Sequence, residues 1–147
     1  MKVTIIEDEG LQDVEVSIRC PAIDEQVAGI VTRLRLRDSK ITGVDEDGRT
    51  RVAAAAEVLY VESVDKKTFA YMEQGVLDVG MPLYEVEERL RACDFLRVSR
   101  SCVVNFGCIK ALRPDINGRL LATLENGEDV VISRQYASDI KHKLGLR

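Results

Sequence analysis

Hydrophobic and polar residues alternate near the N-terminus in a pattern that predicts strands. Lys2–Glu7 is rich in apolar and β-branched residues, and Val14, Val16 and Ile18 are separated by polar residues. A period of two is typical of a strand with one buried face. Residues 8–10, Asp-Glu-Gly, supply a turn between the two runs. We therefore expect an N-terminal β-hairpin.

The segment that follows predicts one amphipathic helix. Its apolar residues recur at helical spacing, at Val27, Ile30, Val31 and Leu34. Asp24 stands where it can cap this helix or complement its dipole. A hairpin and one helix are too few elements to close a core alone. Residues 1–40 are therefore expected to form an extension that packs on the rest of the chain or on a second copy, and that serves oligomerisation or partner binding.

From Ile41 onward, tight turns separate runs rich in Val, Ile, Leu, Phe or Tyr. The turns are expected at Asp47-Gly48, Gln74-Gly75, Asn117-Gly118 and Asn126-Gly127. Asp-Gly and Asn-Gly pairs readily adopt the positive φ angles of hairpins. Because each turn joins two strand-like runs, the pattern predicts a ladder of hairpins and hence mostly antiparallel sheet.

Two short helices interrupt the ladder. The first opens after Pro82 and places Leu83, Val86 and Leu90 on one stripe. The second follows Ser133, a good capping residue, and carries the apolar residues Tyr136, Ile140 and Leu144. Strands dominate, so the expected fold class is mainly β (α+β), with small antiparallel sheets and short helices behind the N-terminal hairpin and its helix.

Composition adds one asymmetry to this picture. The chain has 147 residues, of which 46% are hydrophobic and 31% charged, as in an ordinary soluble globular protein. Its formal net charge is −4, but residues 96–147 carry nine basic and five acidic side chains, which leaves +4 there and −8 on residues 1–95. A basic segment is often associated with contact to a polyanion, and a solvated surface without a partner is the alternative.

No constellation that supports catalysis occurs at a recognisable spacing. The sequence has no G-x-S-x-G, no P-loop and no H-E-x-x-H motif. Its cysteines have no C-x-x-C spacing and only His142 to assist them, which argues against zinc. We therefore expect no enzyme, no cofactor, no metal and no small-molecule substrate. The lack of a signal peptide and of a long apolar stretch predicts a cytoplasmic location.

The four cysteines are Cys20, Cys93, Cys102 and Cys108. In a reducing compartment, free cysteines usually serve as small buried hydrophobes. The alternative is a redox-sensitive pair in which Cys102 and Cys108 lie close together on neighbouring strands.

Two clusters have the chemistry of an anion-binding surface. The run Phe95–Phe106 is crowded with arginine and serine, at Arg97, Ser99, Arg100 and Ser101. Arg can hold phosphate or a guanine edge with two hydrogen bonds, and Ser can donate to phosphate oxygens. The second cluster, Ser133, Arg134 and Gln135, lies at a helix N-terminus, which itself favours anions. The alternatives are a solvated loop and an ordinary helix cap.

A series of motifs follows in one order along residues 58–146. They are Leu59-Tyr60-Val61-Glu62-Ser63, Leu83–Leu90, Phe95–Ser101 leading into Val103-Val104-Asn105, Ile109 and Leu112, the Asn126-Gly127 hairpin and Ile132–Tyr136. In this order they resemble the LytTR DNA-binding domain of bacterial transcription regulators. The resemblance implies a LytTR-like fold over residues 41–147, whose loops enter successive major grooves and recognise imperfect direct repeats in promoters.

The resemblance also implies three DNA-contacting segments. They are Lys66, Lys67 and Thr68 in the loop after Glu62, Arg100 and Ser101 in the second loop, and Ser133 with Arg134 or Gln135 in the third. The chain departs from the family at Ser99, where a histidine is common, so the preferred bases do not follow from the resemblance. Lys66 and Lys67 suit phosphate contacts, because ammonium groups act as point charges.

Two further residues of this region have different expected roles. Arg97 is assigned to phosphate contact, with a structural role as the alternative. Asn105 directly follows the apolar Val103-Val104 pair. Its amide is therefore expected to satisfy the backbone of a turn rather than to contact DNA.

The first functional hypothesis is a stand-alone, sequence-specific transcriptional regulator that binds double-stranded promoter DNA. Direct repeats favour two copies, so self-association as a homodimer is expected. Some relatives are encoded beside a small membrane protein that restrains them, which makes a regulatory membrane protein another possible partner. The alternative is a protein-interaction module or anti-regulator with a LytTR fold and little DNA affinity. Substituting Ala for Arg100 or Arg134 would separate the two hypotheses.

Overall fold

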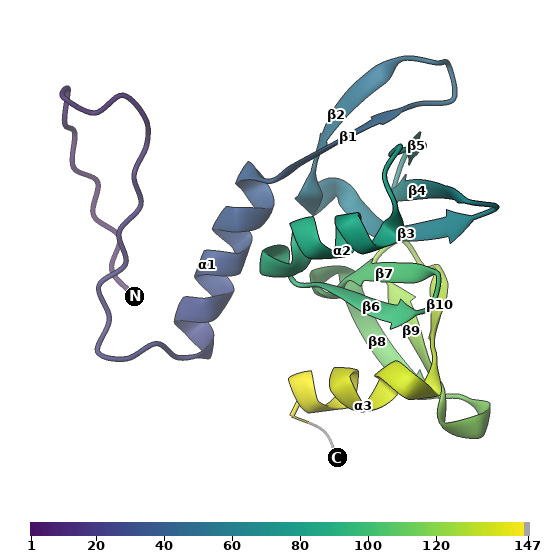
Figure 1. The fold of residues 1–147 in the computed structure, drawn as a ribbon. Coiled ribbons are helices and arrows are strands. Elements are labelled where there is room, and N and C mark those ends of the chain that lie inside the picture. Colours follow the sequence, from purple (N-terminus) through teal and green to yellow (C-terminus); the bar gives the residue numbers. More distant parts are fainter. Residues whose placement is uncertain (146–147) are drawn as a thin grey trace.

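The computed structural model describes residues 1–145 of the chain. Leu146 and Arg147, with which the expected domain ends, lie outside the described residues. In the described part of the chain, two antiparallel sheets form the body of the protein (Figure 1). The larger has seven strands in the order β2-β1-β5-β4-β3-β7-β6, and the smaller has three in the order β10-β9-β8. The expected mainly antiparallel fold is therefore confirmed.

The strands are short, as expected for hairpins joined by tight turns. Those of the larger sheet are β1 (Lys40–Val44), β2 (Thr50–Ala54), β3 (Val58–Val64), β4 (Lys67–Met72), β5 (Val76–Asp78), β6 (Phe95–Ser99) and β7 (Cys102–Asn105). Those of the smaller sheet are β8 (Ile109–Pro114), β9 (Leu120–Leu124) and β10 (Asp129–Ile132). The expected glycine turns are present, with positive φ at Gly48, Gly75, Gly118 and Gly127.

Within residues 1–145, three α-helices accompany the sheets. They are α1 (Glu25–Asp38), α2 (Leu83–Leu90) and α3 (Arg134–Lys143). Short 3₁₀ turns are η1 (Ala55–Glu57), η2 (Arg91–Cys93), η3 (Phe106–Cys108) and η4 (Ile116–Gly118). The expected buried stripe of α2 is confirmed, because Leu83, Val86 and Leu90 are all buried. In α3 the stripe is shorter than expected, since Ile140 is buried but Leu144 caps the helix and is exposed.

Two hydrophobic clusters hold the body together, and β3 and β7 contribute to both. Val61 of β3 and Val103 of β7 belong to the cluster beneath α2. Leu59 and Val104 of the same strands belong to the cluster that joins the larger sheet to the smaller sheet and to α3. All four residues of β7 are buried. Burial on both faces explains why the sequence of β7 is a continuous apolar run rather than an alternation.

The N-terminal hairpin was expected to contain two strands, and this expectation is wrong. The turn forms, because Asp8 accepts hydrogen bonds from the backbone N–H groups of Gly10 and Leu11. No strand is formed among residues 1–24, and Val3 and Val14 are 77% and 85% exposed. Two strands alone have no second layer on which to bury an apolar face. We refer to residues 1–24 as the arm, which Figure 1 shows held away from both sheets.

Helix α1 connects the arm to the body. Its expected cap is confirmed, since the Asp24 carboxylate accepts from Val27 N–H at 3.0 Å. None of its residues is buried, but Leu36 near its end packs against the cluster beneath α2. No helix among residues 1–145 is long and apolar enough to cross a membrane.

The cysteines were expected to be buried, and three of the four are, with Cys20 exposed. The idea that Cys102 and Cys108 lie on neighbouring strands is wrong. Cys102 begins β7, whereas Cys108 lies in η3 beyond the end of the same strand. Burial, reinforced by the Glu62 carboxylate, raises the pKa of the Cys102 thiol to about 12. Burial also raises the pKa of Cys108 to about 11, so both thiols are protonated at neutral pH.

Candidate nucleic-acid interface

The turn between β6 and β7 exposes arginine and serine at one end of the larger sheet. Arg100 and Ser101 form the turn itself and are exposed. The Ser101 N–H donates to the Ser99 hydroxyl at 3.3 Å, and the Ser101 carbonyl accepts from Ser63 N–H of β3 at 2.8 Å. These bonds fix the backbone of the turn while leaving the Arg100 side chain free to extend.

The start of α3 lies beside this turn. The Ser133 N–H donates to the Val98 carbonyl of β6 at 2.8 Å, which ties the helix start to the larger sheet. Ser133 occupies the capping position, as expected, but its hydroxyl caps no backbone N–H among the described residues. That hydroxyl and the first N–H groups of α3 are therefore available to an external acceptor.

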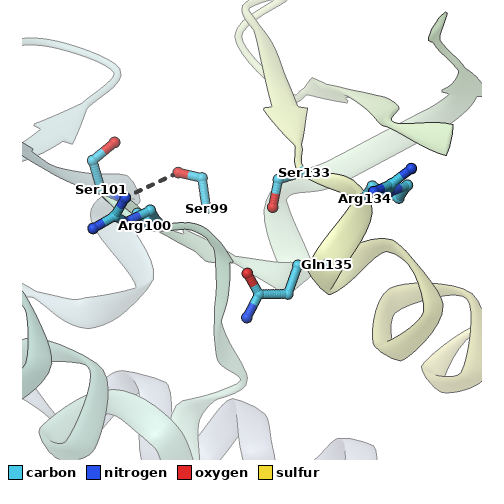
Figure 2. Close-up of a pocket in the computed structure, with 6 residues that line it drawn as sticks. All are labelled: Ser99, Arg100, Ser101, Ser133, Arg134 and Gln135. Carbon is cyan, nitrogen blue, oxygen red and sulfur yellow. Dashed lines mark hydrogen bonds between the residues drawn. The ribbon is translucent and has the colours of Figure 1, made fainter. Parts of the chain in front are cut away.

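The two segments enclose a shallow recess of about 590 Å³. Its lining consists of Ser99, Arg100, Ser101, Ser133, Arg134 and Gln135. In Figure 2 the serines and Gln135 surround the recess, whereas the Arg134 side chain points away from the β6–β7 turn. The aliphatic part of Arg134 lies near Gly118 in η4, where a Cβ would approach its Cδ to 3.0 Å. Arg134 is thus directed toward a different part of the surface from Arg100.

The recess is free of compensating acid. Within residues 1–145, neither Arg100 nor Arg134 forms an ion pair. The lining adds three hydroxyls and one amide to these two guanidinium groups. Such a surface can hold phosphate oxygens and can also form hydrogen bonds with base edges.

The β3–β4 turn lies at the same end of the larger sheet. Glu62 of β3 pairs with Cys102 of β7, so the turn that follows β3 and the turn that precedes β7 lie side by side. Asp65 and Lys66 form the β3–β4 turn with φ angles of 50° and 66°. Positive φ is uncommon for residues other than glycine, Asn and Asp. Lys66 and Lys67 are exposed but do not line the recess.

Two residues assigned to DNA contact are placed less favourably. Thr68 is only 5% exposed and lies on the face of β4 that also buries Ala70 and Met72. Its spacing of two residues from Ala70 is a signal that the sequence already contained. Arg97 is engaged within the protein: its Nε lies 3.6 Å from Glu87 Oε1, and its guanidinium donates to the Arg100 carbonyl at 3.1 Å.

Some residues that support the site had no evident sequence signal. Glu87 of α2 reaches the β6–β7 turn only through Arg97. Lys143 of α3 pairs with Asp94 at 3.0 Å and lies 5.1 Å from the centre of the Phe106 ring. These contacts join residues far apart in the sequence, and neither helical nor strand periodicity predicts them. They hold α2 and α3 against the sheet that presents the turn.

Asn105 has the structural role that was expected of it. It is 2% exposed, its amide donates to the Val58 carbonyl at 3.0 Å, and its side-chain oxygen accepts from Gly107 N–H at 3.2 Å. Both halves of the amide are therefore satisfied by backbone groups, and Asn105 fastens the end of β7 to the start of β3.

A family model and a solved structure both match the part of the chain that carries the interface. Residues 48–145 match the family model of the LytTr DNA-binding domain. A solved LytTr DNA-binding domain from Bacillus cereus has a similar fold, with a TM-score of 0.68 and 35% sequence identity. The similarity covers 74% of this chain and 99% of that domain.

Two kinds of curated relative extend this picture. The sensory transduction protein LytT of Enterococcus faecalis is 31% identical over 109 residues, which are 73% of this chain but only 45% of that protein. An uncharacterized HTH-type transcriptional regulator of Staphylococcus aureus is 24% identical over 147 residues, 99% of both chains. Residues 1–145 of this chain contain no two consecutive α-helices joined by a short turn, so the HTH of that name has no counterpart here.

Proposed function

Because the chain belongs to the family of LytTR DNA-binding domains, we propose that it is a transcriptional regulator that binds promoter DNA through the recess and the turns beside it. The arrangement of two segments carries this proposal: the β6–β7 turn of the larger sheet and the start of α3, which follows the smaller sheet. Ser99–Ser101 and Ser133–Gln135 line one recess, and the guanidinium groups of Arg100 and Arg134 form no ion pair among residues 1–145. The proposed DNA contacts therefore come from the β6–β7 turn and the start of α3 together, and not from the length of one recognition helix.

We assign the exposed side chains to two roles, recognition of base edges and contact with phosphate groups. Arg100 and Gln135 line the recess, and their side chains are of the types that form paired hydrogen bonds with guanine and adenine edges, respectively, in the major groove. Ser99, Ser101 and Ser133 donate to phosphate or base oxygens. Lys66 and Lys67 contact phosphate at the neighbouring turn. Thr68 acts from beneath this turn, where it holds the turn in shape rather than meeting the DNA.

The finer features of the proposal concern assembly and location. Two copies occupy direct repeats in a promoter, and the residues outside the family match, which include the arm and α1, mediate self-association. A membrane protein that captures the arm would be a second way to control the protein. The regulator works in the cytoplasm and has no enzymatic role.

The test is a mobility shift of the gene's own upstream DNA, beside random DNA of equal length and across a series of salt concentrations. We expect specific retention that weakens steeply with salt, because phosphate contacts release counterions. Arg100→Ala and Arg134→Ala should each weaken specific binding by about 1–3 kcal/mol. Lys66→Ala should weaken binding to all sequences and reduce the salt slope by about one contact.

Arg51→Ala is the matched control. Arg51 is exposed on β2, at the edge of the larger sheet opposite to β6. Its loss removes the same charge without touching the recess, so specific binding should stay within about twofold of the wild type. Equal losses for Arg51→Ala and Arg100→Ala would refute a localised interface. Folded protein without any retention at low salt would favour the protein-interaction module instead.

A further inference from the structure

The arm leaves strand-forming residues without a partner. Val14 and Val16 are 85% and 60% exposed. Residues 1–23 form one backbone–backbone hydrogen bond among the described residues, in which Leu11 N–H donates to the Asp8 carbonyl. A hollow of about 1060 Å³ lies between the two runs of the arm and the start of α1, lined in part by Val16, Ile18 and Ile30. Such a segment has both the sequence of a strand and free backbone groups for pairing.

The run Val14–Cys20 is complementary to itself. Its even-numbered positions are all apolar, and its odd-numbered positions are Glu15, Ser17 and Arg19. If two copies pair in antiparallel fashion about a two-fold axis through Ser17, each Glu15 lies opposite Arg19 of the other copy. Val14 then lies opposite Cys20, and Val16 opposite Ile18. Apart from the Ser17–Ser17 pair on the axis, every pair is either oppositely charged or apolar, and each occurs twice.

The first run of the arm lacks this property. A two-fold axis perpendicular to a sheet pairs residues that share a face. In Lys2–Glu7, such an axis through Thr4 places Lys2 opposite Ile6, and one through Ile5 places Glu7 opposite Val3. No such centre within this run brings its two charges together. The self-complementarity is therefore a property of Val14–Cys20 and not of both runs.

We propose that Val14–Cys20 is a dimerisation strand, which adds to the same strand of a second copy and completes a two-stranded ladder across the dimer axis. The apolar face of this ladder covers the hollow and packs over Val27 and Ile30, which are half-buried in one copy. Backbone hydrogen bonds supply affinity, and the two Glu15–Arg19 pairs fix the register. This inference rests on the self-association proposed above but not on DNA binding.

The test is a charge exchange, with the mass of the full chain followed by sedimentation equilibrium. We expect the wild type to be a dimer. Glu15→Arg and Arg19→Glu should each raise the dimer Kd by about tenfold or more, because two attractive pairs become repulsive. The double variant Glu15→Arg/Arg19→Glu should dimerise like the wild type. Both side chains are exposed and form no ion pair among residues 1–145, so neither change disturbs one copy.

Mixing the two single variants gives a sharper result. In a mixed dimer, each positive position of the first variant lies opposite a negative position of the second. A heterodimer should therefore form from two chains that separately dimerise poorly. A basic or acidic partner of another kind would not produce this pattern, because only a two-fold pair makes both substitutions compensate each other.

A disulfide trap reports the register directly. Val14→Cys should cross-link to Cys20 of the second copy under mild oxidation, because residues directly opposite in an antiparallel ladder have Cα atoms about 4.5–5.5 Å apart. The wild type should not cross-link, since the two Cys20 residues would lie six positions apart along the ladder, roughly 20 Å. Asp13→Cys, on the opposite face, is the control and should remain uncross-linked.

Three results would overturn the inference: a wild type that is monomeric at every concentration, single variants that dimerise normally, or a double variant that fails to recover. None of these measurements contains DNA. A dimer that follows the charge exchange but does not bind the promoter would therefore refute the proposed DNA-binding function alone. A monomer that binds a single repeat would refute the dimerisation strand alone.

Discussion

At the scale of single residues, the buried amide of Asn105 connects two strands of the core. It donates to the Val58 carbonyl and accepts from Gly107 N–H. An unpaired buried carbonyl costs more than an ordinary hydrogen bond contributes. The stability of the interface therefore depends in part on a residue that lies behind it and never meets a ligand.

Replacing Asn105 with Ala should lower the free energy of unfolding by about 1–3 kcal/mol. Both hydrogen bonds are lost, and the Val58 carbonyl is left buried without a donor. Urea denaturation measures the change. Asn126→Ala is the control: its amide bonds to Glu128 in an exposed turn, so its loss should cost less than about 1 kcal/mol. Equal costs for the two variants would contradict the assigned role of Asn105.

A second residue-scale effect appears at alkaline pH. Tyr60 stacks on Tyr71 and donates to Glu128 at 2.8 Å. Burial, reinforced by this carboxylate, raises the pKa of the Tyr60 phenol well above its ordinary value of 10.0. The folded protein thus holds the phenol proton more tightly than the unfolded chain. The resulting stability is fully present below pH 10 and is lost as the pH rises through the folded-state pKa.

Tyr60→Phe should remove this contribution. At neutral pH the variant should be less stable by about 1 kcal/mol, because the bond between the two sheets is lost. Above pH 10, its free energy of unfolding should fall less steeply than that of the wild type. Urea titrations at a series of pH values provide the comparison. Parallel curves for the two proteins would show that the Tyr60 proton does not contribute.

At the scale of elements, α2 supports the β6–β7 turn through a contact between Glu87 and Arg97. Arg97 links the Arg100 carbonyl to Glu87, with both side chains largely buried. Sequence reasoning assigned Arg97 to phosphate contact, and the ion pair favours the alternative of a structural role. The distinction matters because a structural contact would strengthen DNA binding indirectly. It orders the turn in the free protein and so lowers the entropic cost of binding.

The substitution Glu87→Gln tests this contact between Glu87 and Arg97. We expect it to weaken DNA binding by roughly two- to fivefold, because Arg97 loses its charged partner and the turn becomes less ordered. Glu88→Gln is the matched control, since Glu88 is exposed on the same helix and forms no ion pair among the described residues. It should leave affinity unchanged or slightly raised. A gain in affinity for Glu87→Gln would instead assign Arg97 to phosphate contact.

Local signals predicted the elements better than their arrangement. The stripe of α2, the Asp24 cap and the glycine turns depend on neighbours in sequence, and all were recognisable. The pairing of β3 with β7 joins residues about forty positions apart, such as Val61 and Val103, and no period in the sequence specifies it. The sequence of the arm predicts a hairpin that the structure lacks, because alternation of apolar and polar residues indicates the character of a strand and not the presence of its partner.

For the candidate site too, the sequence predicted which residues take part better than how they are arranged. Six of the ten assigned residues line one recess, and they were recognised by motif rather than by periodicity. Thr68 was assigned by its place beside Lys67, although its alternation with Ala70 already indicated the buried face. The position of Arg134 beside Gly118 depends on η4, whose proximity to α3 could not be read from the sequence.

At the scale of the whole molecule, the arm and the body are separate in their packing. No residue of the arm is buried, and both hydrophobic clusters are formed by later residues. Charge divides at a different point of the chain, since the acidic excess lies on residues 1–95, which include α1, α2 and most of the larger sheet, and the basic excess lies on residues 96–147. A chain that is acidic overall can therefore still offer DNA a basic end.

Deleting residues 1–23, which leaves the Asp24 cap of α1 in place, should leave the Tm of the body within about 2 °C of that of the full chain. The deletion removes none of the buried contacts of either cluster. Calorimetry measures the change, and Ile41→Ala, which truncates a side chain that is 3% exposed, should lower the Tm by at least roughly 5 °C. A large loss on deletion of the arm would mean that the arm contributes to the core of the body.

The bond between Ser133 N–H and the Val98 carbonyl joins a helix that follows the smaller sheet to a strand of the larger one. The two halves of the recess therefore keep their separation only as well as the sheets keep their relative orientation. Buried residues of the cluster that joins the two sheets, such as Leu124 and Ile132, help to set this orientation. A change in the size of such a buried side chain would therefore alter the spacing of the two halves of the recess without changing any residue that lines it.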